Sequence, residues 1–265
     1  MWAHYLNLLT IRNVTTVNLL KEMGLRKEIQ DKANEILNNN FYVDEVDYVP
    51  QLKDLSFGNS GFKFKGAVLY IDMRGSTKIL NKHNRTTVAK LHMCFFHTIV
   101  KIANNMGGNV RSFNGDSALI FFVGDKDIIS TAVKCAMKIK FMLNNEDNGI
   151  NKQMNKYSSI NFGIGVDYGQ ILCTKVGIEG EHNRDLFWIG NSVNKSTILG
   201  DRSTSPQHIS ISKFVFENLT DNLKWGQKLN WLDNKVKFPL WEEDEFRYNG
   251  EDETCYKTGA CFPVY

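Results

Sequence analysis

One short apolar run that ends on a single carboxylate constrains the fold of this chain more than any other feature. Residues 66–71 read Gly-Ala-Val-Leu-Tyr-Ile, Asp72 follows, and the turn Met-Arg-Gly-Ser-Thr occupies residues 73–77. A run this short and this apolar, bounded by turn residues, predicts a buried strand. Other elements must cover such a strand, and this one carries one acid to its end.

The segments that follow alternate between strand and helix patterns. Apolar residues recur at helical spacing over 86–105 and 127–144, and Asn114-Gly115 marks the turn of a hairpin within 106–124. Further elements are expected in this order: a strand pair over 158–177 turned near Tyr168-Gly169, a strand over 184–190, a helix over 191–199, a strand over 208–212 and a final hairpin within 253–265. This order predicts an α+β sandwich with a mixed sheet and helices on one face.

The bulk properties indicate one globular domain with extensions. Hydrophobic residues make up 42% and charged residues 23% of the 265-residue chain, which is ordinary for a globular protein. We expect a compact domain over 62–220 and an N-terminal extension over 1–61 that includes a helix at 25–37. A C-terminal extension over 221–265 would complete this domain or pack on it.

The N-terminus and the cysteines indicate a cytoplasmic protein. Residues 1–13 are too polar for a signal peptide or a membrane span, and no apolar run reaches about 18 residues. The five cysteines are odd in number and contain no CxxC pair, which favours reduced thiols, although Cys255 and Cys261 could form a bridge across the terminal hairpin. The net charge of +3 gives little support to a nucleic-acid partner.

Two carboxylates suggest a metal site. Asp116 lies just past the Asn114-Gly115 turn, and a hairpin beside the first strand would bring it to Asp72. Close acids repel each other unless a divalent cation neutralises them, and Mg²⁺ leaves coordination positions for water and phosphate. Such a pair suits two-metal phosphoryl transfer, and the N–H groups of residues 73–77 could bind a triphosphate. Alternatively, Asp72 caps a helix and Asp116 favours the turn.

Four motifs together resemble those of class III nucleotidyl cyclases, the adenylate and guanylate cyclase catalytic domains. They are YIDMRGST at 70–77, RSFNGDSALIFF at 111–122, GIGVDYGQI at 163–171 and WIGNSVNKS at 188–196. Their order and spacing match the family over roughly residues 62–220. The resemblance implies a ferredoxin-like palm core and a head-to-tail homodimer with two active sites at its interface.

The resemblance also implies a role for each matched residue. Asp72 and Asp116, assisted by the carbonyl of Met73, would bind two Mg²⁺ or Mn²⁺ ions. Asn194 would orient the ribose in the partner's site. The 3′-hydroxyl would attack the α-phosphate and release pyrophosphate. The triphosphate would lie on the turn formed by Met73, Arg74, Gly75, Ser76 and Thr77.

The positions that read the base depart from the purine cyclases. Adenylate cyclases carry Lys and Asp where this chain has Ser112 and Phe187, and the guanylate cyclase pair is also missing. An aromatic side chain at Phe187 would narrow the pocket and favour a pyrimidine, with Arg111 or Asp185 assisting, unless Phe187 only packs in a core. The chain therefore resembles the pyrimidine cyclases of bacterial Pycsar antiphage defence. UTP, slightly favoured over CTP, would give cyclic UMP or cyclic CMP for a separate effector.

A second departure concerns the cation that stabilises the transition state. The family's arginine, four residues after Asn194, is replaced by Ile198. Arg202 could reach the triphosphate only if the helix ends early and the chain turns back, and Lys195 is a surface alternative. The choice among Lys235, Lys237 and Lys257 for the terminal phosphates stays open.

The alternative functions are an adenylate or guanylate cyclase with an unusual pocket and a nucleotide-binding pseudoenzyme, which Ile198 would favour.

Overall fold

The computed structural model describes residues 22–145, 147–229 and 234–264. Residues 1–13, and with them part of the predicted extension 1–61, lie outside this described part. In chain order the strands are β1 (Tyr42–Glu45), β2 (Ser60–Arg74), β3 (Asn109–Asn114), β4 (Ser117–Val123), β5 (Asn161–Gly177), β6 (Arg184–Ile189), β7 (Ile209–Ser212), β8 (Trp225–Leu229), β9 (Lys235–Pro239), β10 (Glu242–Tyr248) and β11 (Glu251–Thr258). The helices are α2 (Ser76–Lys82), α3 (Arg85–Asn105), α4 (Ile128–Asn144), α5 (Asn151–Asn155), α6 (Asn191–Arg202), α7 (Lys213–Glu217) and α8 (Asp221–Lys224), and residues 22–38 are also helical.

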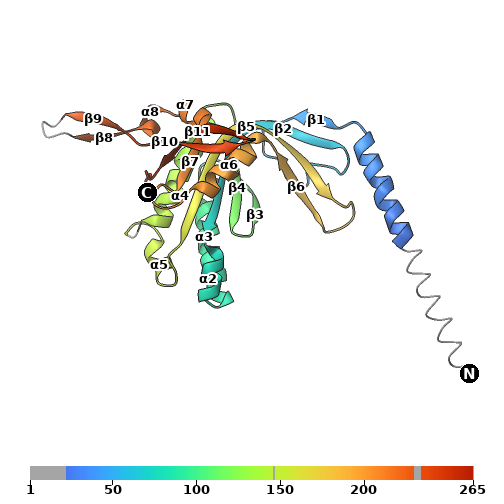
Figure 1. Cartoon of the computed structure of the whole chain (residues 1–265), viewed down its shortest axis with the longest axis horizontal. Helices are drawn as coiled ribbons and strands as arrows, with labels where there is room; N and C mark the ends of the chain where they lie inside the picture. The colour runs from blue at the N-terminus through green and yellow to red at the C-terminus, as the bar shows by residue number, and fades with distance from the viewer. Residues whose placement is uncertain (1–21, 146, 230–233, 265) are drawn as a thin grey trace, which may run out of the picture.

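A nine-stranded mixed sheet forms the body of the molecule (Figure 1). Its main order is β10-β11-β7-β5-β2-β4-β3, with β1 paired to β2 and β6 paired to β5. Strand β2 lies between β4 and β5 and pairs antiparallel with both. The predicted α+β architecture with a mixed sheet is therefore confirmed.

Strand β2 is buried on both faces, as the apolar run predicts. Leu69 and Ile71 belong to one buried cluster with residues of α3 and α4, such as Phe95 and Ala132. Val68, which alternates with them, packs on the opposite face in a second cluster that includes Phe64, Phe121 and Trp188. Two layers of side chains thus hold β2 in place and fix the position of its carboxyl end.

Helix α6 lies on the face of the sheet opposite α3 and α4, so the expectation of helices on one face is wrong. Its Val193 packs in the second cluster with Val68, and its backbone lies against β5. A Cβ atom added to Gly165 would lie 1.9 Å from the carbonyl oxygen of Ser196. Gly165 pairs with Tyr70 of β2, so α6 covers the face that carries Tyr70 and Asp72.

Strand β5 is one continuous strand, so the turn expected near Tyr168-Gly169 is wrong. It pairs with β2 from Asn161, opposite Arg74, to Thr174, opposite Gly61. A glycine within a strand marks either a bend or a close approach of another element. Gly169 is of the second kind, because an added Cβ would contact the Ser192 side chain of α6 at 3.4 Å.

The C-terminal residues extend the sheet. Strands β10 and β11 form a hairpin whose turn lies at Asn249 and Gly250, both with positive φ, and β11 pairs with β7. The hairpin expected within 253–265 is therefore shifted toward the N-terminus: it is formed by β10 and β11, and β11 ends at Thr258. Strands β8 and β9 form a separate hairpin that projects from the body at the end opposite helix 22–38 (Figure 1).

All five cysteines are free thiols, so the bridge considered between Cys255 and Cys261 is absent. Cys255 is buried and Cys261 is exposed.

Within the described residues, no helix is both long and apolar enough to cross a bilayer.

Asp167 of β5 provides a prediction on stability. Its carboxylate is 5% exposed and accepts a hydrogen bond from Ser212 Oγ at 2.5 Å, and burial raises its pKa to about 6. Between about pH 4 and pH 6 the folded protein keeps a proton that the unfolded chain has released, so rising pH destabilises the fold through this group. The loss is at most about 3 kcal/mol.

Asp167→Asn should lack this loss, so its free energy of unfolding relative to the wild type should increase from pH 4.5 to pH 7. Urea titrations of both proteins at the two pH values would measure the difference. Asp147→Asn, at an exposed position, is the control substitution. A difference between Asp167→Asn and the wild type that does not depend on pH would contradict the prediction.

Candidate active site

The end of β2 and the β3–β4 turn bring Asp72 and Asp116 together, as the sequence predicts. Asp72 is directly opposite Ser117, the first residue of β4, and Asp116 immediately precedes it. Gly115 supplies the positive φ of 62° that the tight turn requires. The Met73 N–H donates a hydrogen bond of 3.2 Å to the Asp116 carbonyl oxygen, which ties the turn to β2.

The Asp72 carboxyl group is poorly hydrated and lies close to that of Asp116. Burial and, to a smaller extent, the adjacent Asp116 raise the pKa of Asp72 to about 7, although the Arg74 guanidinium opposes both effects. A carboxylate pair of this kind is stabilised by a cation that binds both members. The local charge therefore fits the predicted divalent metal.

The donor set also fits such an ion. Among residues 22–145, 147–229 and 234–264, no group of three or more His, Cys, Asp or Glu side chains could hold a metal. Two carboxylates and a main-chain carbonyl would be the protein's whole contribution, which suits Mg²⁺ because this ion keeps several waters or phosphate oxygens. Met73 could contribute only its backbone, since its side chain is 1% exposed within the core.

The turn after Asp72 has the geometry expected of an anion-binding segment. Gly75 adopts a left-handed conformation with φ of 72° and precedes the first turn of α2, which starts at Ser76 and Thr77. No side chain caps the N-terminal N–H groups of α2. These N–H groups have no partner within the helix, so phosphate oxygens could accept from them.

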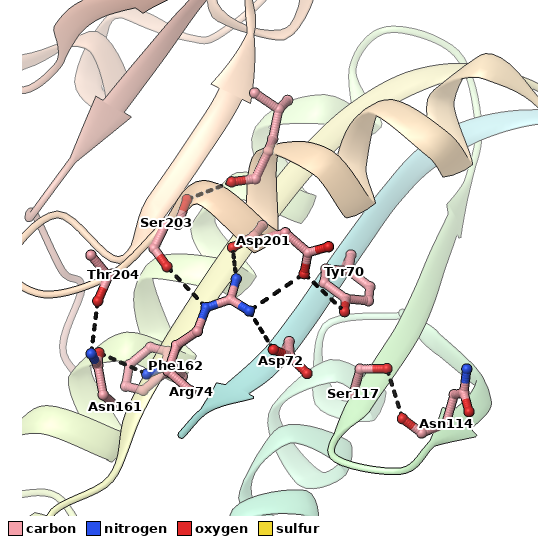
Figure 2. A network of polar contacts seen from close by, with 12 residues as sticks. Tyr70, Asp72, Arg74, Asn114, Ser117, Asn161, Phe162, Asp201, Ser203 and Thr204 are labelled. Carbon is pink, nitrogen blue, oxygen red and sulfur yellow. Dashed lines mark hydrogen bonds and ion pairs between the residues drawn. The ribbon is translucent and has the colours of Figure 1, made fainter. Parts of the chain in front are cut away.

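Arg74 does not point along this turn, although the sequence assigns it to the triphosphate. Its Nη1 pairs with Asp72 Oδ2 and lies 3.4 Å from Asp201 Oδ1. Its Nε donates to the Ser203 carbonyl oxygen at 3.2 Å, and its Nη2 donates to the Gly200 carbonyl oxygen. Figure 2 shows the guanidinium between β2 and the C-terminal end of α6.

Sequence reasoning missed the residues that complete this network. The Tyr70 hydroxyl donates to Asp201 Oδ1 at 3.2 Å, and burial raises the pKa of Tyr70 well above its usual value (Figure 2). Alternation along β2 could have placed Tyr70 on the same face as Asp72. Asp201 could not have been found in this way, because it is 131 residues from Tyr70 in the chain.

Ser112 and Phe187 lie on opposite faces of the sheet. Ser112 is paired with Leu119, which packs in the cluster of Val68 on the Asp72 face. Trp188 is buried in the same cluster, so strand alternation directs Phe187 to the other face, where it is 56% exposed. Within one chain, Ser112 and Phe187 therefore do not line one pocket, and the role of Phe187 in selecting the base stays a prediction.

The remaining candidates for the base pocket also have other positions. Arg111 donates to the carbonyl oxygens of Pro50 at 3.2 Å and Val49 at 3.3 Å, and so holds the segment before β2 against the sheet. Asp185 is exposed, and its Oδ1 accepts a hydrogen bond from the Leu186 N–H at 2.7 Å.

Helix α6 presents Asn194 to solvent on its exposed side. The helix continues through Arg202, so the early end and reversal that Arg202 would need are absent. Arg202 Nη2 instead donates to the Glu245 carbonyl oxygen at 2.8 Å. Lys195 Nζ pairs with Glu253 Oε1 at 2.7 Å and lies 4.8 Å from the centre of the Tyr248 ring. Both cations therefore contact β10 or β11.

The three lysines considered for the terminal phosphates are separated in space. Lys235 and Lys237 lie on β9 of the projecting hairpin, and Lys237 is 3.5 Å from Asp221. Lys257 lies on β11, 3.5 Å from Asp244, and Arg202 approaches the same carboxylate at 4.0 Å. Of the three, Lys257 is the one that lies beside the C-terminal end of α6.

Comparison with known proteins gives consistent results. Residues 65–255 match the family described as the adenylate and guanylate cyclase catalytic domain. The chain is 29% identical over 207 residues to a uridylate cyclase of Burkholderia cepacia, with 77% of this chain and 88% of the relative covered. It is 31% identical over 199 residues to a uridylate cyclase of Gulbenkiania mobilis, with 71% and 76% covered. The crystal structure of the guanylyl cyclase Cya2 has the same fold, with a TM-score of 0.61 and 19% identity over 77% of this chain and 96% of that one.

Proposed function

The chain belongs to the adenylate and guanylate cyclase catalytic domain family and is a nucleotidyl cyclase, and within this family we propose that it converts UTP to 3′,5′-cyclic UMP and pyrophosphate. The observation that carries the proposal is the juxtaposition of Asp72 and Asp116 beside a turn that opens into α2, whose first N–H groups no side chain caps. The choice of UTP is supported by the relatives named uridylate cyclases and by the absence of the purine-reading residues at Ser112 and Phe187.

In the proposed mechanism, Asp72, Asp116 and the Met73 carbonyl would hold two divalent cations. When bound, these ions lower the pKa of the ribose 3′-hydroxyl and stabilise the charge that develops on the phosphate. The N–H groups of residues 75–77 bind the triphosphate. A bond forms between O3′ and the α-phosphorus, and the bond between the α-phosphorus and the oxygen that bridges it to the β-phosphorus breaks. Pyrophosphate leaves, and the hydroxyl proton passes to solvent.

The proposed active enzyme is a homodimer in which the partner completes each site. Asn194 supports this arrangement, because it is exposed on α6 and no hydrogen bond within the described chain occupies it. In the partner's site its amide would fix the ribose so that O3′ faces the α-phosphate. The proposal gives no catalytic role to Arg202, because β10 binds its guanidinium.

A biological role follows from the resemblance to the Pycsar pyrimidine cyclases. We propose that cyclic UMP from this enzyme acts as a second messenger in antiphage defence and is detected by a separate effector.

CTP is the second candidate substrate, because a cytosine ring is of the same size as uracil. Ile198 replaces the family's transition-state arginine, and this replacement is the one sequence feature that would favour a pseudoenzyme.

The proposed activity is tested by incubating the full chain separately with UTP, CTP, ATP and GTP in the presence of Mn²⁺ or Mg²⁺. Chromatography with mass spectrometry would identify the products, and we expect cyclic UMP to form fastest. Turnover of ATP or GTP alone would contradict the pyrimidine assignment. Metal-dependent binding of nucleotide without release of pyrophosphate would identify a pseudoenzyme.

A further inference from the structure

The Arg74 guanidinium has partners on two sides. On one side it pairs with Asp72, which the proposed function assigns to the metal. On the other side it contacts the end of α6 through the carbonyl oxygens of Gly200 and Ser203 and through Asp201 at 3.4 Å (Figure 2). One side chain therefore connects a metal-binding carboxylate to a helix that is more than 120 residues away in sequence.

The pair formed by Arg74 and Asp72 is largely shielded from water. The exposed fraction of the side chain is 22% for Arg74 and 13% for Asp72. Ion pairs between shielded groups with good hydrogen-bond geometry are stronger than pairs at an open surface. The guanidinium also reduces the repulsion between Asp72 and Asp116, which is the effect that a divalent cation would have.

Arg74 can leave Asp72 without becoming unpaired. Carbonyl oxygens at the C-terminal end of a helix attract a cation. Here Arg74 binds two of them: that of Gly200, which also accepts the Ser203 N–H at 3.0 Å, and that of Ser203, which follows α6. Asp201 supplies a second carboxylate, 52% exposed, that can take the charge of the guanidinium. The cost of breaking the pair with Asp72 is reduced accordingly.

From these contacts we infer that Arg74 is a positioning residue that neutralises Asp72 in the metal-free enzyme and gives way to the divalent cation while it stays bound to α6. The inference rests on the proposed metal site. Since Arg74 and the metal compete for one carboxylate, the enzyme without nucleotide binds metal weakly. The nucleotide's phosphates add ligands for the metal, so tight metal binding requires substrate.

The competition is measured by the affinity of the nucleotide-free full chain for Mn²⁺, followed by electron paramagnetic resonance or calorimetry at about pH 8.5. Arg74→Ala removes the competing charge and should tighten Mn²⁺ binding about tenfold, the value expected for one charge-assisted pair. Arg74→Lys keeps the charge and should change the affinity less. Arg247→Ala, which breaks a pair with Asp252 on the distant β10–β11 hairpin, is the matched control and should have no effect.

Asp201→Asn gives a test in the opposite direction. It removes the second carboxylate, so the guanidinium stays on Asp72 and Mn²⁺ should bind about threefold more weakly. This variant also decides the question if Arg74→Ala does not fold. Unchanged or weaker binding in folded Arg74→Ala, or unchanged binding in Asp201→Asn, would overturn the inference. Wild-type Mn²⁺ binding that persists in Asp116→Ala would instead show that the metal site itself is misassigned.

Discussion

Asp116→Asn is expected to lower the rate of cyclisation at least about a thousandfold while leaving the fold intact. Asparagine keeps the size of the side chain and lacks the charge that would hold two divalent cations. The backbone of Asp116 should be preserved, because its carbonyl oxygen accepts the Met73 N–H and Gly115 sets the turn. Pyrophosphate release and thermal unfolding, measured on the same preparation, separate the effect on turnover from any effect on stability.

Asp125→Asn is the control, because Asp125 is an exposed aspartate in the loop after the other end of β4. It should leave turnover close to the wild-type value. Cells that carry Asp116→Asn in place of the wild type should also lose any protection against phage. Activity that survives in Asp116→Asn would remove this residue from the metal site.

The same variant tests the proposed dimer. Asp116→Asn and Asn194→Ala chains should each be inactive, because one lacks a metal ligand and the other lacks the residue that orients the partner's ribose. In a mixture, heterodimers contain one site with both residues intact, so activity should return. No recovery after the chains are mixed and shown to exchange would contradict sites built from both protomers.

The parts of this molecule that could be predicted from sequence are those with local signals. The apolar run of β2 and the turn at Asn114-Gly115 each depend on a few adjacent residues, and together they place Asp72 beside Asp116. The helix that follows Gly190 is similarly marked by its own spacing. Because these signals are local, the sequence specifies the position of the two aspartates better than it specifies the rest.

The failures arise where a signal has two physical meanings or where the partner is distant. A glycine in β5 could mark a turn or a close approach, and the choice depends on α6. The face on which Phe187 lies depends on sheet register, in which a shift of one residue exchanges the two faces. Arg74 appeared to belong to the phosphate turn, because its partners Gly200 and Ser203 are separated from it by more than 120 residues.

Gly165→Ala is expected to destabilise the fold by about 3 kcal/mol or more, which is large for the addition of one methyl group. The added Cβ would lie 1.9 Å from the Ser196 carbonyl oxygen and 2.3 Å from the Gly200 nitrogen. Both are backbone atoms of α6, so the whole helix must move away from β5. That movement would displace Asn194 and also the carbonyl oxygens that bind Arg74, so activity should fall with stability.

Gly169→Ala is the matched control, because Gly169 lies four residues further along β5 on the same face, also against α6. Its added Cβ would contact only the Ser192 side chain, at an ordinary distance of 3.4 Å, so we expect a loss below about 1 kcal/mol. Urea unfolding of the two variants would measure the difference. Equal losses at the two positions would mean that α6 does not pack closely on β5, and the position of Asn194 relative to the sheet would then have to be revised.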